Sequence, residues 1–335
     1  MAPEIPNDIV LYWYPFSPYA YRIYWYLLLR GIKFASCIQP HMLPRPDLKA
    51  LNVEYRRIPI LSIGKDIYLD SRHILSKLET LFPGSELSPR TPEHRLIQKL
   101  LDRWTTNGSV FGIAAQMIPA DSPAMRDPKF IKDRNDGGMK ILAGEARKRM
   151  RPEAIVAMRD CFDILENTIL ADGRMWVFGG NRPSLGDIEA LWPFAWVMGM
   201  PGALPDAISA KTFPRVFSWA SRFNAVIKDI KSAQSVSVDI KGKDVVEYME
   251  SAQYAEPSAN VDENDPLGLS RGELVEVYPT DYGFSHKDRG KLLTLTPYEA
   301  VITKQLNSGT EFRVHVPRWG YRITKVKEGG DLAKI

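Results

Sequence analysis

The sequence predicts an α/β unit at the N-terminus, an all-helical unit in the middle and a small β-rich region at the C-terminal end. Strand-like and helix-like segments alternate over residues 9–82, whereas apolar residues at helical spacing dominate residues 93–227. Short segments of alternating apolar residues then occupy residues 273–326. Because 335 residues exceed what one hydrophobic core usually organises, we expect domains at residues 1–83, 84–231 and 232–335.

The composition argues against a nucleic-acid or membrane partner. The chain has 44 basic and 40 acidic residues, a net charge of +4, and no dense Lys/Arg block. Its two cysteines, Cys37 and Cys161, belong to no Cys-x-x-Cys pair and no cluster with metal-ligand spacing. The first residues lack the features of a signal peptide. We therefore expect a cytoplasmic protein with small partners and no bound metal.

The expected α/β unit begins with an apolar strand that leads into a helix. Proline and serine residues form a turn between the two, and Gly31 is placed to end the helix as a C-cap. The expected strands are residues 9–14, 33–38, 58–63 and 66–69, and the expected helices are residues 19–30 and 71–82. This order gives a compact unit of about the size of a thioredoxin domain.

The remaining elements follow from changes in periodicity. Residues 84–92 contain two prolines and are expected to be a linker. The expected helices are residues 93–117, 150–170, 185–198 and 214–227. The expected C-terminal strands, preceded by a polar linker at 256–266, are residues 273–278, 291–296, 300–305, 312–316 and 321–326. They favour a folded accessory domain rather than a solvated tail.

Ser17, at the start of the first helix, is the first candidate for chemistry. Backbone N–H groups at a helix start are unpaired and carry the positive end of the helix dipole, so they stabilise a thiolate placed there. The Ser17 hydroxyl would add one further donor to that sulfur. The alternative is that Ser17 only caps the helix.

Two further short motifs precede a strand and a helix. A proline at position 59 is typical of a turn that exposes the backbone of Ile58, which can then pair with a small peptide. Ser71 and the free N–H groups of its helix suit a carboxylate, while Asp70 suits an ammonium group. Taken singly, the proline motif also fits an ordinary edge strand, and the Asp70-Ser71 motif also fits an ordinary N-cap.

Together these motifs resemble the glutathione site of the cytosolic glutathione transferases. The resemblance continues in Arg45-Pro46-Asp47-Leu48, which looks like a loop of the omega-type members. Residues 179–188, Gly-Gly-Asn-Arg-Pro-Ser-Leu-Gly-Asp-Ile, are similar to the family's capping box and buried helix. The sequences of residues 43–48 and 55–59 also resemble those of glutathione-transferase-like proteins from filamentous fungi that carry an extra C-terminal region. The resemblance covers residues 9 to about 230.

The resemblance implies a fold and a set of roles. It implies a thioredoxin-like domain, an all-α glutathione-transferase C-terminal-type domain and, after them, the β-rich accessory domain. The implied roles are the sulfur contact for Ser17, the backbone clamp for Ile58 and Pro59, the γ-glutamyl anchor for Asp70 and Ser71, the glycine carboxylate for Arg45 with His41, and the cysteinyl part for Met42.

One departure from the omega-type pattern bears on the reaction. Those proteins have cysteine where Ser17 stands, and a serine cannot form the mixed disulfide that thiol–disulfide exchange needs. The resemblance therefore implies a glutathione transferase that activates glutathione as thiolate for attack on a small apolar electrophile. A glutathione-dependent cis/trans isomerase and a non-catalytic binding or assembly module stay open as alternatives, and a homodimer is expected.

Other candidate residues have weaker support. Tyr14 is an alternative sulfur ligand, although an aromatic residue at a strand end more often belongs to the core. Cys37 lies in an apolar strand and is expected to be buried and inert. Residues that would line a second-substrate pocket, or form ordinary helical core, are Trp104, Phe111, Ile113 and Met117.

Overall fold

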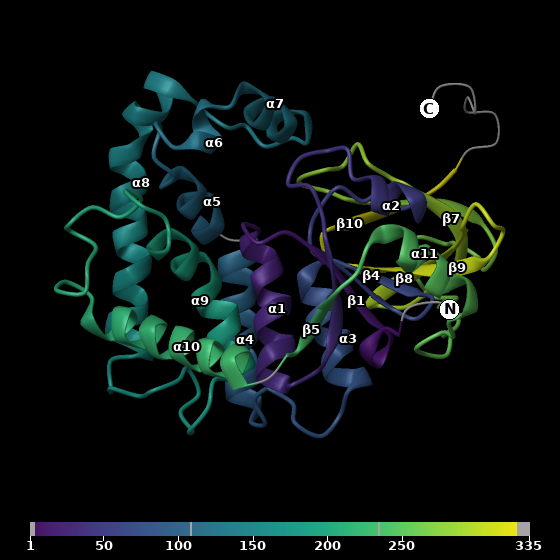
Figure 1. Ribbon diagram of the computed structural model, residues 1–335, viewed down its shortest axis with the longest axis horizontal. Coiled ribbons are helices and arrows are strands. Elements are labelled where there is room, and N and C mark those ends of the chain that lie inside the picture. The colour runs from purple at the N-terminus through teal and green to yellow at the C-terminus, as the bar shows by residue number, and fades with distance from the viewer. Residues whose placement is uncertain (1–3, 108, 234, 327–335) are drawn as a thin grey trace.

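The computed structural model describes residues 4–107, 109–233 and 235–326. Figure 1 shows helices gathered on one side of the molecule and a large sheet on the other. Ten strands form this sheet in the order β10-β6-β7-β8-β9-β4-β3-β1-β2-β5. The sheet therefore joins strands from both ends of the chain.

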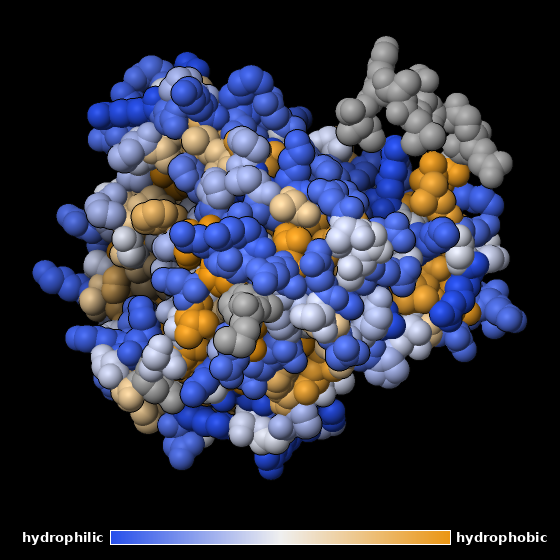
Figure 2. Space-filling model, turned by 45° about the vertical axis from the view of Figure 1, so that its right-hand side comes forward, coloured by the Kyte–Doolittle hydropathy of each residue, from blue (hydrophilic) through white to orange (hydrophobic). Residues whose placement is uncertain are grey.

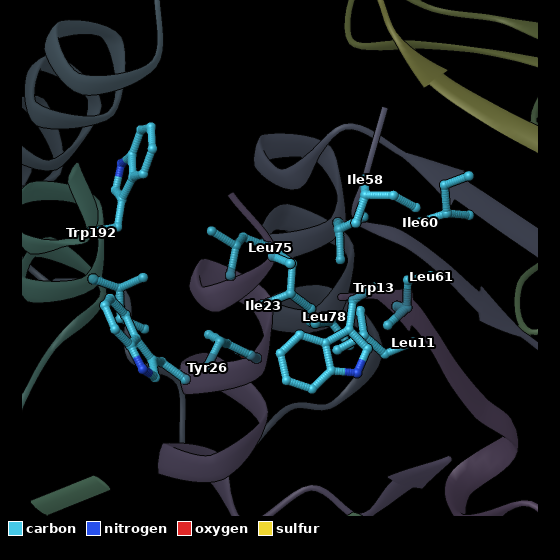
Figure 3. Packing of buried hydrophobic residues seen from close by; sticks show 14 of the residues in the cluster. Leu11, Trp13, Ile23, Tyr26, Ile58, Ile60, Leu61, Leu75, Leu78 and Trp192 are labelled. Carbon is cyan, nitrogen blue, oxygen red and sulfur yellow. The ribbon is translucent and has the colours of Figure 1, made fainter. Parts of the chain in front are cut away.

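The thioredoxin-like unit forms the centre of this sheet. It consists of β1 (Ile9–Trp13), α1 (Pro18–Arg30), β2 (Phe34–Ile38), α2 (Pro46–Ala50), β3 (Ile60–Ile63), β4 (Asp66–Leu69) and α3 (Ser71–Leu81). All five residues of β1 are buried, as expected for a strand covered on both faces. Gly31 ends α1 in the left-handed conformation, as predicted. Figure 3 shows Ile23, Leu75 and Leu78 packed where α1 meets α3.

The helical unit contains α4 (Pro92–Thr106), α5 (Ser109–Gln116), α6 (Pro123–Arg126), α7 (Pro128–Asp136), α8 (Gly144–Ile164), a π turn (Leu165–Ile169), α9 (Leu185–Met198) and α10 (Pro214–Ala233). The expected helix at 93–117 is thus two helices, and α6 and α7 were not predicted. The capping box at the start of α9 is confirmed: Ser184 and Asp187 bond reciprocally. None of the helices within the described residues has the length and apolarity that crossing a membrane would demand.

The five predicted C-terminal strands are confirmed, and they extend the central sheet. They are β6 (Leu274–Pro279), β7 (Asp288–Leu295), β8 (Glu299–Gln305), β9 (Glu311–Pro317) and β10 (Tyr321–Lys325). β9 pairs in parallel with β4, in the register Ile67 to Val314. The short strand β5 (Ser237–Asp239) pairs with β2 at the other edge, and α11 (Gly242–Ser251) packs on α2. Residues 235–326 thus cover both edges of the thioredoxin-like sheet.

A buried ion pair fixes the C-terminal strands to the N-terminal unit. Asp288, at the start of β7, is 1% exposed and accepts hydrogen bonds from the backbone N–H groups of Glu54 and Tyr55. Lys304 Nζ from β8 lies 2.6 Å from the same carboxylate. The segment that leads into β3 is therefore anchored to β7 by the Asp288 carboxylate, which Lys304 of β8 neutralises.

A second buried cation connects the thioredoxin-like unit to the helical unit. Arg22 of α1 is fully buried, and its guanidinium lies 2.6 Å from Ser71 Oγ of α3 and 2.6 Å from Asp102 Oδ1 of α4. It also bonds Glu189 of α9 and lies 5.7 Å from the centre of the Trp192 ring. One guanidinium therefore holds four helices together.

The surface seen in Figure 2 is mainly hydrophilic, with apolar side chains in separate patches. Large exposed apolar side chains include Phe16, which is 82% exposed, and Trp319, which is 59% exposed. Trp319 lies in the turn between β9 and β10, where the Arg103 guanidinium of α4 stacks 4.4 Å from its ring centre. The C-terminal strands thus contact the helical unit as well as the sheet.

Removal of residues 232–335 should cause aggregation or a loss of stability. The truncation exposes the unpaired edges of β4 and β2, which can then pair with other chains. Light scattering and thermal unfolding of the truncated protein test this expectation. A truncated protein that stays soluble and unfolds at the same temperature would instead make the region an independent module.

The Arg22 cluster should make stability depend on pH through Glu189. Burial and the neighbouring Asp102 raise the pKa of Glu189 above its ordinary value despite the attraction of Arg22. A raised pKa means that the contribution of Glu189 to stability is complete below its ordinary pKa and is lost as the pH rises through the raised pKa. Glu189→Gln should therefore flatten the fall in unfolding free energy over this range, by at most about 1.4 kcal/mol per pH unit.

Denaturant unfolding at a series of pH values measures this slope. The matched control is Glu247→Gln, because Glu247 is exposed on α11. Equal slopes for the wild type and Glu189→Gln would mean that Glu189 is already ionised in the folded protein.

Candidate functional site

The predicted site residues meet at one edge of the thioredoxin-like sheet. Tyr12 of β1 pairs with Ile60 of β3, and Ile60 pairs with Leu69 of β4. The end of β1, the start of β3 and the end of β4 therefore lie side by side. Ser17, Ile58 and Asp70 follow or precede these strands by a few residues. The sheet register thus brings the three predicted motifs together.

Ser17 is the N-cap of α1. Its Oγ accepts a hydrogen bond from the N–H of Ala20 at 3.3 Å, and Pro18 occupies the first helical position. Ser17 is only 3% exposed. Because the hydroxyl oxygen acts as the acceptor in the cap, its proton is still available to a second partner. The capping role is confirmed, and it leaves the predicted sulfur contact chemically feasible.

The peptide bond between Ile58 and Pro59 is cis, and both residues are buried. Among the described residues, the backbone N–H and C=O of Ile58 take part in no hydrogen bond. Buried backbone groups without partners are rare in folded proteins. Both groups of Ile58 are therefore open to the backbone of an extended ligand.

Asp70 is the N-cap of α3 and is held by Arg72, two residues further along the chain. Its carboxylate accepts from the N–H of Arg72 at 3.0 Å and pairs with the Arg72 guanidinium at 3.0 and 2.9 Å. Burial alone would raise the pKa of the Asp70 carboxyl. The charge and hydrogen bonds of Arg72, together with the charge of Arg57, outweigh this effect and lower the pKa to about 2. Asp70 therefore stays an anion at neutral pH, although an internal cation already partners it.

Ser71 has an internal partner as well. Its Oγ accepts a hydrogen bond from the buried Arg22 guanidinium at 2.6 Å. The hydroxyl proton then points away from Arg22, because the oxygen is the acceptor in this contact. The sequence reasoning did not foresee this contact, since Arg22 lies 49 residues away in the chain. Arg22 thus orients the hydroxyl of the predicted anchor.

The loop before α2 uses its arginine internally. Arg45 is 6% exposed, donates to the Pro40 carbonyl at 2.9 Å and also bonds the carbonyl of Arg56. Burial lowers the pKa of the Arg45 guanidinium. His41 is exposed and Met42 is half-buried. Arg45 therefore donates hydrogen bonds to two backbone carbonyl groups and so shapes the loop before α2.

The helical unit reaches this loop through α7, which was not predicted. Asp133 Oδ1 accepts from the N–H of Leu43 at 3.2 Å, and Arg134 donates to the His41 carbonyl at 2.7 Å. Arg134 also lies 3.5 Å from the Tyr14 hydroxyl, so Tyr14 is engaged at the same place. α7 therefore covers one side of the candidate site.

The C-terminal region borders the site on another side. Arg57 donates to the Tyr282 carbonyl at 2.7 Å and pairs with Asp281, both in the turn between β6 and β7. The hydroxyl groups of Tyr321 and Tyr55 lie 2.8 Å apart. The two arginines before Ile58 were the only sequence feature that could have indicated this contact. They did not reveal it, because the partners of Arg57 lie more than 220 residues away in the chain.

The predicted second-substrate residues divide between an aromatic cluster and the core. Phe111 lies 4.7 Å from Tyr19 and 5.6 Å from Trp192, measured between ring centres. Met117 is completely buried and is a core residue. Trp104 and Ile113 are half-buried. Tyr19 of this aromatic cluster belongs to α1, the helix that Ser17 caps.

Cys37 is buried, as predicted. Burial, followed by the nearby Asp47, raises the pKa of its thiol to about 12. A thiol that stays protonated is a poor nucleophile. Cys37 therefore offers no replacement for a cysteine at position 17.

Comparison with known proteins is consistent with this arrangement. Residues 11–86 match the family model of the glutathione S-transferase N-terminal domain, and residues 113–232 match a domain of unknown function (DUF7962). A protein named probable glutathione transferase omega-2 from Caenorhabditis briggsae is 31% identical over 136 residues. That match spans 39% of this chain and 52% of the relative, about half of its length.

Solved structures share the fold at low sequence identity. A GST-like protein from Pseudomonas syringae has a TM-score of 0.70 and 22% identity, covering 95% of this chain and all of its own. A tau class glutathione S-transferase from mango, Mangifera indica, has a TM-score of 0.50 and 17% identity, covering 67% of this chain and 93% of its own. The family match therefore shows a glutathione S-transferase N-terminal domain at residues 11–86, and the solved structures show that the fold of the chain is shared with glutathione transferases.

Proposed function

We propose that the protein is a glutathione transferase that activates glutathione as thiolate at Ser17 for attack on a small apolar electrophile. The observation that carries the proposal is the backbone of the buried residue Ile58, whose N–H and C=O have no partner among the described residues. An extended tripeptide bound there would complete both hydrogen bonds. Ser17 and Ser71 lie at neighbouring helix starts, where a sulfur and a carboxylate are stabilised.

In this mechanism each group contributes to one part of glutathione. The ionised Asp70 attracts the ammonium group, while the Ser71 hydroxyl, oriented by Arg22, donates to the γ-glutamyl carboxylate. The Ser17 hydroxyl and the N–H groups at the start of α1 stabilise the thiolate, which then attacks the electrophile held near the aromatic cluster of Tyr19, Phe111 and Trp192.

The roles of the remaining site residues are also proposals. Pro59 sets the direction of the Ile58 backbone, and Met42 would contact the cysteinyl part. Arg45 would act on the glycine carboxylate by shaping the loop before α2, because its guanidinium donates to the backbone carbonyls of Pro40 and Arg56. A homodimer is proposed as well, supported by exposed Leu96, Ile97 and Leu100 on α4. The cytoplasmic location stays a prediction of the sequence.

Ser71→Ala should weaken glutathione binding by about 1–3 kcal/mol, because a charge-assisted hydrogen bond to the carboxylate is lost. Calorimetric titration measures the dissociation constant. Ser76→Ala, at an exposed position on the same helix, is the matched control. Thermal unfolding of both variants separates this loss from the loss of the Arg22 contact. No binding by the wild type at several millimolar glutathione would favour a non-catalytic module.

Ser17→Ala should raise the pKa of the thiol of bound glutathione and reduce conjugation more than affinity. The reason is that the hydroxyl donor stabilises the thiolate and not the thiol. Ultraviolet titration of the thiolate and rates with a panel of electrophiles measure the two effects. Ser17→Cys should instead confer some thiol–disulfide exchange. An unchanged titration with full activity would exclude Ser17 and direct attention to Tyr14 or to the helix N–H groups.

A further inference from the structure

A second cluster of reactive side chains lies where the C-terminal strands join the thioredoxin-like sheet. It contains His73 of α3, Glu299 of β8 and His315 of β9. One ligand atom from each of them lies within 4.8 Å of the others. His73 is 8% exposed and His315 is 2% exposed. The glutathione site uses none of these three side chains.

The hydrogen bond between His315 and Asp66 fixes which ring nitrogen is free. His315 Nε2 lies 2.9 Å from Asp66 Oδ1, and an ionised carboxylate can only accept, so Nε2 carries the proton. In the neutral ring, Nδ1 then presents a lone pair. Metal-binding histidines have this arrangement, with a carboxylate on the nitrogen that faces away from the ion.

The lone pair of His315 faces other acceptors. Nδ1 lies 3.3 Å from Glu299 Oε2 and 3.6 Å from Glu256 Oε1. His73 Nε2 lies 3.3 Å from the same Glu299 oxygen, yet it has no hydrogen-bond partner among the described residues. Two acceptors that face each other repel unless a cation lies between them. The contact between His315 Nδ1 and Glu299 Oε2 therefore requires a cation, either a proton or a metal ion.

Two of the three distances between ligand atoms fit a tetrahedral ion, and all three atoms lie within 4.8 Å of one another. Ligand atoms about 2.0–2.2 Å from a tetrahedral zinc lie roughly 3.3–3.6 Å apart, whereas octahedral magnesium brings neighbouring ligands to about 3.0 Å. The two 3.3 Å separations around Glu299 Oε2 match the tetrahedral value. Two imidazoles with a carboxylate form a known zinc donor set, and imidazole suits zinc far better than magnesium.

The charges around the cluster leave room for a cation. With neutral imidazoles, the carboxylates of Asp66, Glu256 and Glu299 exceed the nearby cations Lys77 and Arg313 by one negative charge. Lys77 Nζ bonds Glu299 Oε1 at 2.9 Å, so it leaves Oε2 directed at the two histidines. Lys77 therefore orients Glu299 without occupying the space between the imidazoles.

We propose that His73, Glu299 and His315 bind a zinc-type divalent cation, with Glu256 or water as the fourth ligand. The ion would connect α3 to β8 and β9, and so fix the C-terminal strands to the helix that begins at Ser71. Its buried setting indicates a structural role. The proposal does not depend on glutathione binding.

The full-length protein, treated with a chelator and then titrated with Co2+, tests the site. We expect one ion per chain with the intense visible absorption of tetrahedral Co2+, displaced by Zn2+, and a higher unfolding temperature with Zn2+. Because even the partners of metal ligands contribute about 10–100-fold to affinity, His73→Ala should weaken Co2+ binding roughly 100-fold or more. Glu299→Gln should act in the same direction.

The matched control is His286→Ala, since His286 lies in the turn between β6 and β7, outside the cluster. It should bind Co2+ as the wild type does. The proposal is overturned if the wild type gives neither the tetrahedral spectrum nor stabilisation by Zn2+, because the shared cation is then a proton. Equal binding by His73→Ala and the wild type would also overturn it. The wild-type measurements decide the question even if a variant fails to fold.

Discussion

The fully buried guanidinium of Arg22 joins the two parts of the protein that form the candidate site. It bonds Ser71 of α3, Asp102 of α4 and Glu189 of α9 from its own place on α1. A buried charge of this kind is costly unless every partner stays in position. The orientation of the thioredoxin-like unit against the helical unit and the direction of the Ser71 hydroxyl therefore depend on the same contact.

The C-terminal region has a comparable structural effect on the sheet. A thioredoxin-like sheet alone would leave the outer edges of β2 and β4 unpaired, and here β5 and β9 pair with them. The buried pair of Asp288 and Lys304 holds the segment before β3, and the polar cluster around His315 lies where β9 pairs with β4. The domain boundary expected near residue 231 stays a prediction, since strands on both sides of it share one sheet.

Local signals predicted much of the fold and of the candidate site. The turn residues, the cap of α1, the Ile-Pro step and the Asp-Ser start of α3 all act within a few residues, so the sequence displays them directly. The internal partners of the site were not predictable in this way. Arg22 reaches Ser71 across 49 residues, and Arg57 reaches the Tyr282 carbonyl across 225. No local pattern encodes such distances.

By itself, the sequence determined nine of the ten strands of the sheet, most of the long helices and the three motifs of the candidate site, because periodicity and capping are short-range effects. The tertiary structure alone decided that the C-terminal strands extend the central sheet, and that Arg45 bonds backbone carbonyls. It also brought His73 to His315 and Glu299, which lie more than 220 residues further along the chain. Metal-ligand spacing cannot be recognised in a sequence when strand pairing, rather than a short motif, brings the ligands together.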